Sequence, residues 1–173
     1  ILALYGLLLT KSRHDMTINL DTSELERVLH NAANHLTHTA PLMEDISRAL
    51  LSETMMNFQL GGRPAWAGLS PVTLARRAHG GGAILQDTGE LKRTIKATHT
   101  DDTATIGTNL VYAPTHQFGA KMGQYGHTAK SPIPWGDIPA RPFIPIDKNG
   151  DISYDGFLVV REVVNGYLAS AFD

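Results

Sequence analysis

The chain has 173 residues, 42% of them hydrophobic, and a formal net charge of −2. That is enough apolar material for one buried core, but the sequence is too rich in Gly and Pro for a coiled coil or a membrane bundle. The near-neutral balance gives no global basic field that would attract nucleic acid. Cysteine is absent, which excludes a disulfide framework, a thiolate zinc site and a cysteine nucleophile.

The first nine residues are almost all apolar. They are too few to span a bilayer, which needs about twenty, and no small-residue cleavage site of the signal-peptide kind follows them. A sequence of ordinary globular character begins at Met16. We therefore expect residues 1–15 to be a non-native or upstream extension and residues 16–173 to form a single domain. A genuine N-terminal strand is the alternative reading of the apolar run.

Two helices are predicted next, after a short strand over 17–20. Asp21 and Glu24 have the spacing of a helix N-cap and its capping-box partner. Pro41 suits the first turn of the second helix, which we expect to end at Gly61-Gly62. The apolar face of the first helix repeats at helical spacing: Leu25, Val28, Leu29, Ala32 and Leu36.

The middle of the chain predicts a short helix and a hairpin. Ser70-Pro71 is a typical N-cap and first-turn pair, and the Gly80–Gly82 run that follows is expected to be flexible. Residues 93–99 and 103–108 alternate as two strands would, around a turn at Asp101-Asp102. The last helix is predicted from Asp155 onward by its 3.6-residue apolar period.

These elements predict the α+β class. The expected architecture is two N-terminal helices, a small antiparallel sheet and a C-terminal helix packed on it. The prolines at 139, 142 and 145 exclude a central strand or a helix interior between the sheet and the last helix.

Asp87-Thr88-Gly89 is the strongest enzymatic signal, since a homodimer with this turn could pair two carboxylates as an aspartic hydrolase does. That turn needs apolar strands on both sides, whereas charged residues follow it here. We therefore interpret it as a loop in which Asp87 or Thr88 caps a helical turn. The Asp147–Asp151 segment resembles the start of an EF-hand but lacks its later Gly and Glu, so a Gly-centred turn is expected.

Charge is distributed unevenly along the sequence. Residues 16–62 carry a net charge of −4, residues 63–96 carry +4, and residues 145–173 carry −3. Ordinary solvated surface explains this pattern, but so does head-to-tail contact between a basic patch on one subunit and an acidic patch on its neighbour. Heterologous contacts of that kind close into rings.

Three short patterns follow one another between Ile84 and Phe143. They are the run Leu85–Leu91, the run Tyr112–Gly119 with the sequence YAPTHQFG, and the run Ile138–Phe143 with the sequence IPARPF. In that order they resemble the phage virion morphogenesis family of Mu G-like and P2 S-like tail-completion proteins, and more loosely the neck and tail-completion proteins of HK97-like phages. We expect their aromatic residues to anchor long loops and Gly119 to allow a sharp turn.

The resemblance implies a structural protein and no enzyme, cofactor or metal site. It implies a tail-completion, tail-terminator or neck component that forms a homo-oligomeric ring, expected to be a hexamer, at the head–tail junction. Its partners would be itself, the tail tube and the head-completion proteins, with non-specific contact to genome DNA in the lumen and no membrane. It would act in the host cytoplasm and then in the virion. A dimeric aspartic hydrolase using Asp87 and a DNA-contacting head-completion factor are the alternatives.

On this resemblance we expect one set of residues to form the assembly interface: Trp66, Arg76, Arg77, Tyr112, His116, Phe118, Gly119, Arg141 and Phe143.

Overall fold

The computed structural model describes residues 8–11, 16–19, 21–77, 83–122, 124 and 137–172. The glycine run at 80–82 and most of the polar loop expected after Gly119 lie outside the described residues. The helices are α1 (Ser23–Thr37), α2 (Ala40–Leu60), α3 (Pro71–Arg76), α4 (Glu90–Thr94), α5 (Ala113–Phe118) and α6 (Tyr154–Ser170). The strands are β1 (Leu8–Lys11), β2 (Met16–Asn19), β3 (Lys96–His99) and β4 (Ala104–Gly107).

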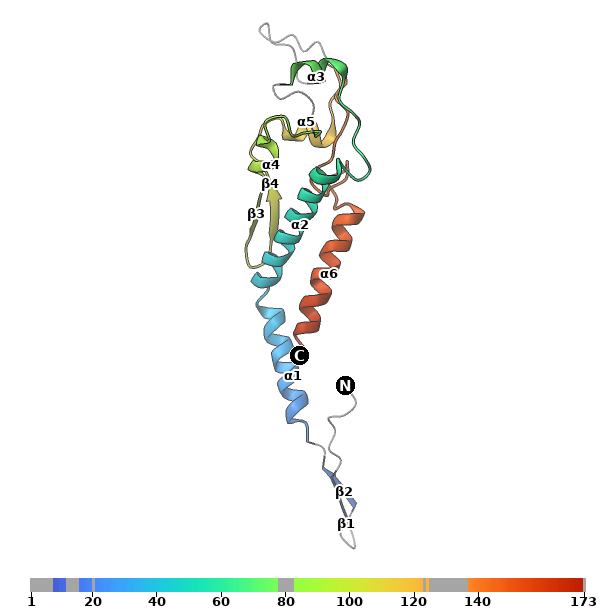
Figure 1. Cartoon of the computed structure of the whole chain (residues 1–173). Coiled ribbons are helices and arrows are strands. Elements are labelled where there is room, and N and C mark those ends of the chain that lie inside the picture. Colours follow the sequence, from blue (N-terminus) through green and yellow to red (C-terminus); the bar gives the residue numbers. More distant parts are fainter. Residues whose placement is uncertain are drawn as a thin grey trace.

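The molecule is elongated, with α2 as its central element (Figure 1). The hairpin β3–β4 packs on one side of α2 and α6 packs on another. Helix α2 therefore lies between the hairpin and α6. Both sheets are two-stranded and antiparallel, β1 with β2 and β3 with β4. The predicted α+β class and the hairpin are therefore confirmed. No helix in the described part of the chain is long and apolar enough to cross a membrane.

The core lies at the C-terminal end of α2, where this helix packs against the loop that follows it and against the segment around Phe143. The Phe58 ring lies 5.7 Å from the Trp66 ring and 5.6 Å from the Phe143 ring, and all three side chains are buried. Leu91 and Ile95 complete this core from α4 and its C-terminal end. Rings at such separations contribute about 0.5–1.5 kcal/mol per pair beyond the area they bury.

Several predicted helix ends are confirmed by their capping geometry. Pro41 lies in the first turn of α2, and Gly61 ends that helix in the left-handed region at φ +73°. The Ser70 hydroxyl accepts a hydrogen bond from the Thr73 N–H at the start of α3. The predicted turn at 147–151 is also present, with Gly150 at φ +89°.

The predicted N-cap of α1 is wrong by one residue. Thr22 is the N-cap, whereas the Asp21 carboxylate accepts a hydrogen bond from the Ser23 N–H at 3.0 Å, which lowers the pKa of Asp21. Glu24 does not complete a capping box. Its carboxylate instead pairs with the Arg27 guanidinium one turn later, at 2.7 Å.

Two stretches predicted as strand and loop contain helices. The strand expected over 93–99 begins only at Lys96, because Glu90–Thr94 form α4 after Gly89 turns at φ +72°. The motif Tyr112–Gly119, expected to be a loop, is the helix α5 with Pro114 in its first turn. In both cases the helix has five or six residues, which is shorter than the window in which helical periodicity can be recognised.

Candidate functional site

The segment from Arg141 to Ile146 is held in place by side chains from three other elements. In α5, the buried Gln117 accepts hydrogen bonds from the main-chain N–H groups of Phe143 and Ile144 at 2.9 and 3.0 Å. Its amide nitrogen donates to the carbonyls of Ile144 and Ile146 at 3.0 and 3.3 Å. Gln117 therefore satisfies four main-chain groups of a segment that lies outside the two described sheets and pairs only at its end, through the isolated bridge between Ile146 and Ile152.

The same segment is also fixed from α2 and from the loop after it. The Asn57 amide of α2 donates to the Phe143 carbonyl at 3.1 Å, and the Trp66 indole N–H donates to the Pro142 carbonyl at 3.0 Å. Arg63 donates to the Asn57 side chain at 3.2 Å and pairs with the buried Glu53. Buried polar groups with all these partners favour one conformation of the segment.

Arg141 joins this segment to the loop before α3. Its Nε donates to the Ala67 carbonyl and its Nη2 to the Gly68 carbonyl, both at 2.9 Å, and its main-chain N–H donates to the His116 carbonyl at 2.7 Å. The residue is only 7% exposed. Burial of the guanidinium, and then the positive charge of Arg77, lower the pKa of Arg141.

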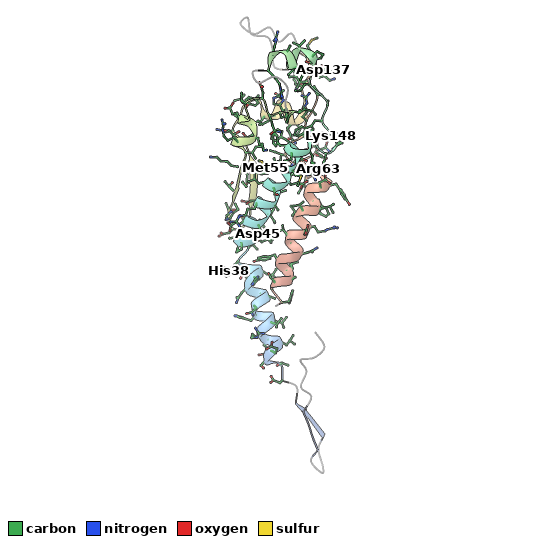
Figure 2. All side chains as sticks on the ribbon, viewed as in Figure 1. His38, Asp45, Met55, Arg63, Asp137 and Lys148 are labelled. Carbon is green, nitrogen blue, oxygen red and sulfur yellow. The ribbon has the colours of Figure 1, made fainter. Side chains whose placement is uncertain are left out.

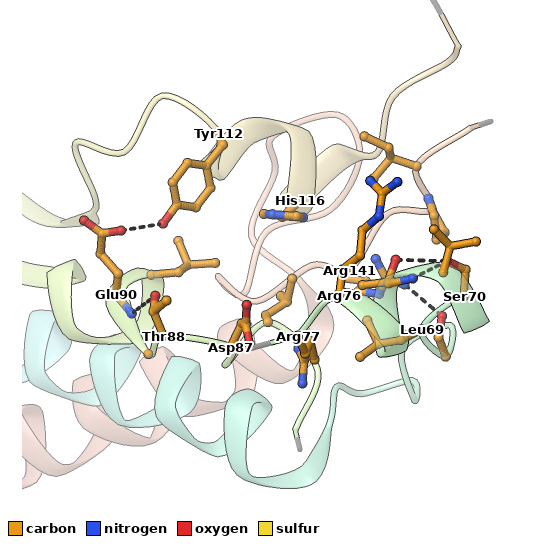
Figure 3. Close-up of a pocket in the computed structure, with 18 of the residues that line it drawn as sticks. Leu69, Ser70, Arg76, Arg77, Asp87, Thr88, Glu90, Tyr112, His116 and Arg141 are labelled. Carbon is orange, nitrogen blue, oxygen red and sulfur yellow. Dashed lines mark hydrogen bonds between the residues drawn. The ribbon is translucent and has the colours of Figure 1, made fainter. Parts of the chain in front are cut away.

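A pocket of about 1030 Å³ opens beside Arg141. Figure 3 shows Tyr112 and Glu90 at one end of it, His116 between, and Arg76, Arg141 and Ser70 toward the other end. Its residues come from α3, α4, α5 and the segment 137–141, which are far apart in the sequence. Its apolar lining includes Leu69, Val72, Leu85, Leu91, Ile138 and Pro139.

Tyr112 and His116, which line this pocket, also have shifted pKa values. Burial raises the pKa of Tyr112, and so does Glu90, whose carboxylate accepts a hydrogen bond from the Tyr112 hydroxyl at 3.4 Å. Burial lowers the pKa of His116, and the charge of Arg141 adds to that effect. The His116 Nδ1 is buried and has no hydrogen-bond partner within the described part of the chain. Both effects favour the neutral form of the His116 imidazole.

The structure separates the nine predicted interface residues into three groups. Arg76, Arg77, Tyr112, His116 and Arg141 all line the pocket. Two aromatic residues, Trp66 and Phe143, are buried in the core, as was expected of Phe143 as a loop anchor. The last two, Phe118 and Gly119, end α5. The interface role of all nine residues stays a prediction.

Two of the predicted aromatic anchors are not buried. Phe118 is 48% exposed and Tyr112 is 41% exposed, because α5 turns these two side chains away from the core while Ala113 and Gln117 face inward. The predicted turn at Gly119 is confirmed, with φ at +76°. A Cβ at this position would lie 2.8 Å from the Ala140 nitrogen and the Ile138 oxygen, so only glycine fits.

The sequence analysis missed the residues that position the site. Gln117, Asn57 and Glu53 are all buried polar side chains in helices. For Asn57 and Glu53 there was a signal, since both interrupt the inner face of a predicted helix. For Gln117 the signal was weaker, because α5 itself was not recognised.

The arrangement contains little of what catalysis requires. Asp87 lines the pocket but is exposed, whereas an aspartic hydrolase needs a buried pair of carboxylates. Across the described residues there is no cluster of three His, Asp or Glu side chains that could hold a metal ion. The pocket combines an apolar surface with both arginines and carboxylates, and Arg76 and Arg141 lie toward one end of it.

A second surface lies at the other end of the molecule, on α1 (Figures 1 and 2). Leu25, Leu29 and Leu36 are 43%, 55% and 61% exposed, and Ala32 is the buried residue of this helix. The base of α1 is tied to α6 by Tyr167, whose hydroxyl lies 2.7 Å from the His35 carbonyl and 2.8 Å from the His38 carbonyl.

The sequence pattern of the phage virion morphogenesis family matches residues 20–169. The chain belongs to this family. It is 36% identical, over 72% of its length and 78% of the relative's, to the Mu-like prophage FluMu G protein 2 of Haemophilus influenzae. It is 32% identical to the putative capsid assembly protein G of Escherichia phage Mu, over 79% of this chain and 87% of that protein. No solved structure matches the chain. The resemblance found in the sequence motifs is thereby confirmed.

Proposed function

We propose that this virion morphogenesis protein is a structural tail-completion or neck component that assembles as a homo-oligomeric ring at the head–tail junction. The ring would be a hexamer, would contact the tail tube and the head-completion proteins, and would carry out no catalysis. It would form in the host cytoplasm and remain in the virion. The family match and the putative capsid assembly relative support a role in building the particle.

The observation that carries the proposal is the exposed apolar face of α1. A helix of 15 residues is marginal in water by itself and gains most of its stability from packing. Here the leucines of that face remain exposed in the single chain. A protein that works by assembly has this property, because a partner supplies the missing contacts.

Complementation of a Mu-like prophage that lacks its G protein tests the proposal. Without the protein, we expect complete heads and complete tails to accumulate unjoined, and plasmid-borne wild-type protein to restore joined particles in electron micrographs. Immunogold label on a tagged copy should lie at the junction. A defect in forming the heads themselves, with no free heads found, would show a capsid role and overturn the junction role.

The oligomer is tested separately on purified protein. Light scattering during gel filtration should give about six times the mass of one 18.8 kDa chain, and negative-stain images should show rings. A protein that stays monomeric alone and with isolated heads or tails would refute the ring.

A further inference from the structure

Helix α1, which carries the exposed leucines, lies toward one end of the molecule, and α3, α4 and α5, which line the pocket, lie toward the other (Figure 1). Between them stands α2, whose 21 residues span about 31 Å. The two surfaces therefore cannot meet within one chain. Any contact between them joins two molecules, and it uses a different surface on each partner.

Three leucines of α1 form an exposed apolar stripe, which is interrupted by the buried Ala32 on the same face. Leu25, Leu29 and Leu36 fall within about 40° around the helix axis, since successive residues turn by about 100°. Single exposed apolar residues are normal on protein surfaces, but three leucines aligned on one helix are typical of a helix that lies in an apolar groove. The pocket supplies such a lining with Leu69 and Val72, the latter 51% exposed.

The charges of the two surfaces are complementary. The first residues of the α1 region, 21–27, hold three carboxylates against one guanidinium, a net charge of −2. In Figure 3, Arg76 and Arg141 lie toward one end of the pocket and Arg77 lies nearer its middle, beside Asp87. The carboxylates of Asp87, Glu90 and Asp137 also line the pocket, so the basic part of its surface is the end with Arg76 and Arg141. Arg77 lies close enough to the buried Arg141 for its positive charge to lower the pKa of Arg141, so positive charge is concentrated beside this part of the pocket.

We propose that α1 of one copy docks in the pocket of the next copy, with its acidic N-terminal end toward the arginines and its leucines against Leu69 and Val72. This inference rests on the proposed homo-oligomer and names the surfaces that form it. A head-to-tail contact generates a ring when its rotation closes after a whole number of subunits, which is the closure that the proposed oligomer requires. A parallel pairing of two α1 helices would instead bring their carboxylates together, which is unfavourable.

Cysteine pairs test the contact directly, because the chain has no cysteine of its own. Leu29→Cys and Val72→Cys are each made in separate proteins, at exposed positions that leave the core intact. Mixed under mild oxidation, the two proteins should form a disulfide-linked heterodimer, and a chain with both changes should form a covalent ladder. Leu29→Cys mixed with Thr98→Cys, on the exposed side of β3, is the matched control and should give no such product.

Charge exchange provides a second measurement. Arg76→Glu with Arg77→Glu should weaken self-association at least tenfold, and Glu24→Arg with Glu26→Arg should do the same. Mixing the two variants should restore association, because the exchanged charges again attract. Far-UV circular dichroism checks that each variant is folded.

Three results would overturn the inference. Leu29→Cys alone could form the covalent dimer, which shows symmetric α1 pairing. Rings could persist undiminished in the Arg76→Glu/Arg77→Glu variant. Duplex DNA could bind the wild-type pocket end with steep salt dependence and lose this affinity in that variant, with no cross-link formed. In each of these three cases the wild-type protein could still form rings and join heads to tails, so the proposed function would not be refuted. If the wild-type protein neither formed rings nor restored joined particles, the proposed function itself would be refuted.

Discussion

Replacing Gln117 by leucine tests whether the Arg141–Ile146 segment depends on one side chain. The substitution keeps the approximate volume and helix preference but removes all four hydrogen bonds of the buried amide. Two main-chain N–H groups, those of Phe143 and Ile144, then lose their acceptor. A buried donor left unsatisfied costs about 1–3 kcal/mol, so the pair gives about 2–6 kcal/mol.

Leucine recovers part of that loss by burying more apolar surface, so we expect a net destabilisation of about 3 kcal/mol. For a chain of this length, that lowers the melting temperature by about 6–12 °C. Urea unfolding followed by circular dichroism at 222 nm gives the free energy directly. The Trp66 fluorescence gives an independent signal, since this residue donates to the Pro142 carbonyl at the end of the same segment.

Gln59→Leu is the matched control, because it makes the same chemical change at an exposed position of α2. It should alter the free energy of unfolding by less than about 0.5 kcal/mol. If Gln117→Leu behaves like this control, the segment is held by its apolar contacts and not by the amide. An equal loss in both variants would show that leucine itself, and not the buried site, causes the effect.

Other predictions concern the same region. Phe143→Ala should destabilise by about 3–5 kcal/mol, because its fully buried ring leaves a cavity; a smaller loss in urea unfolding would show that the core collapses around it. Gly119→Ala should lower the melting temperature in calorimetry, since its Cβ would meet Ala140; an unchanged transition would contradict the tight approach. The lowered pKa of His116 means that the unfolded chain takes up a proton that the folded chain does not as pH falls below about 6.5. The wild type should therefore lose stability as pH falls below that value, and His116→Gln should lose less; identical pH profiles would refute the assignment.

The elements that the sequence predicted correctly are those with strong local signals. Pro41, Gly61 and Ser70 mark helix ends through conformations or side-chain hydrogen bonds that depend on a few neighbouring residues. The long apolar period of α6 identified that helix without further information. The hairpin β3–β4 followed from alternation around a polar turn.

The site could be predicted only in part, because it is assembled from distant segments. The motifs placed Arg141 and Phe143 together, and indicated Tyr112 and His116, but gave no means to tell which aromatic side chains face inward. That depends on α5, whose six residues are too short for a period to show. Gln117 acts on residues 26–29 positions away, and nothing local to it indicates those partners.

The junction between α1 and α2 has a mechanical consequence. With its 15 residues α1 is a lever of about 22 Å, so a tilt of about 10° at its base displaces its tip by about 4 Å. Tyr167 bridges this base to α6 through its hydroxyl, shared between two carbonyls at the end of α1, and through its ring, which lies 5.4 Å from the His35 ring. The Tyr167 hydroxyl thus helps fix the orientation of α1 relative to the rest of the protein. Tyr167→Phe would leave the other elements folded and would widen the range of orientations that α1 adopts.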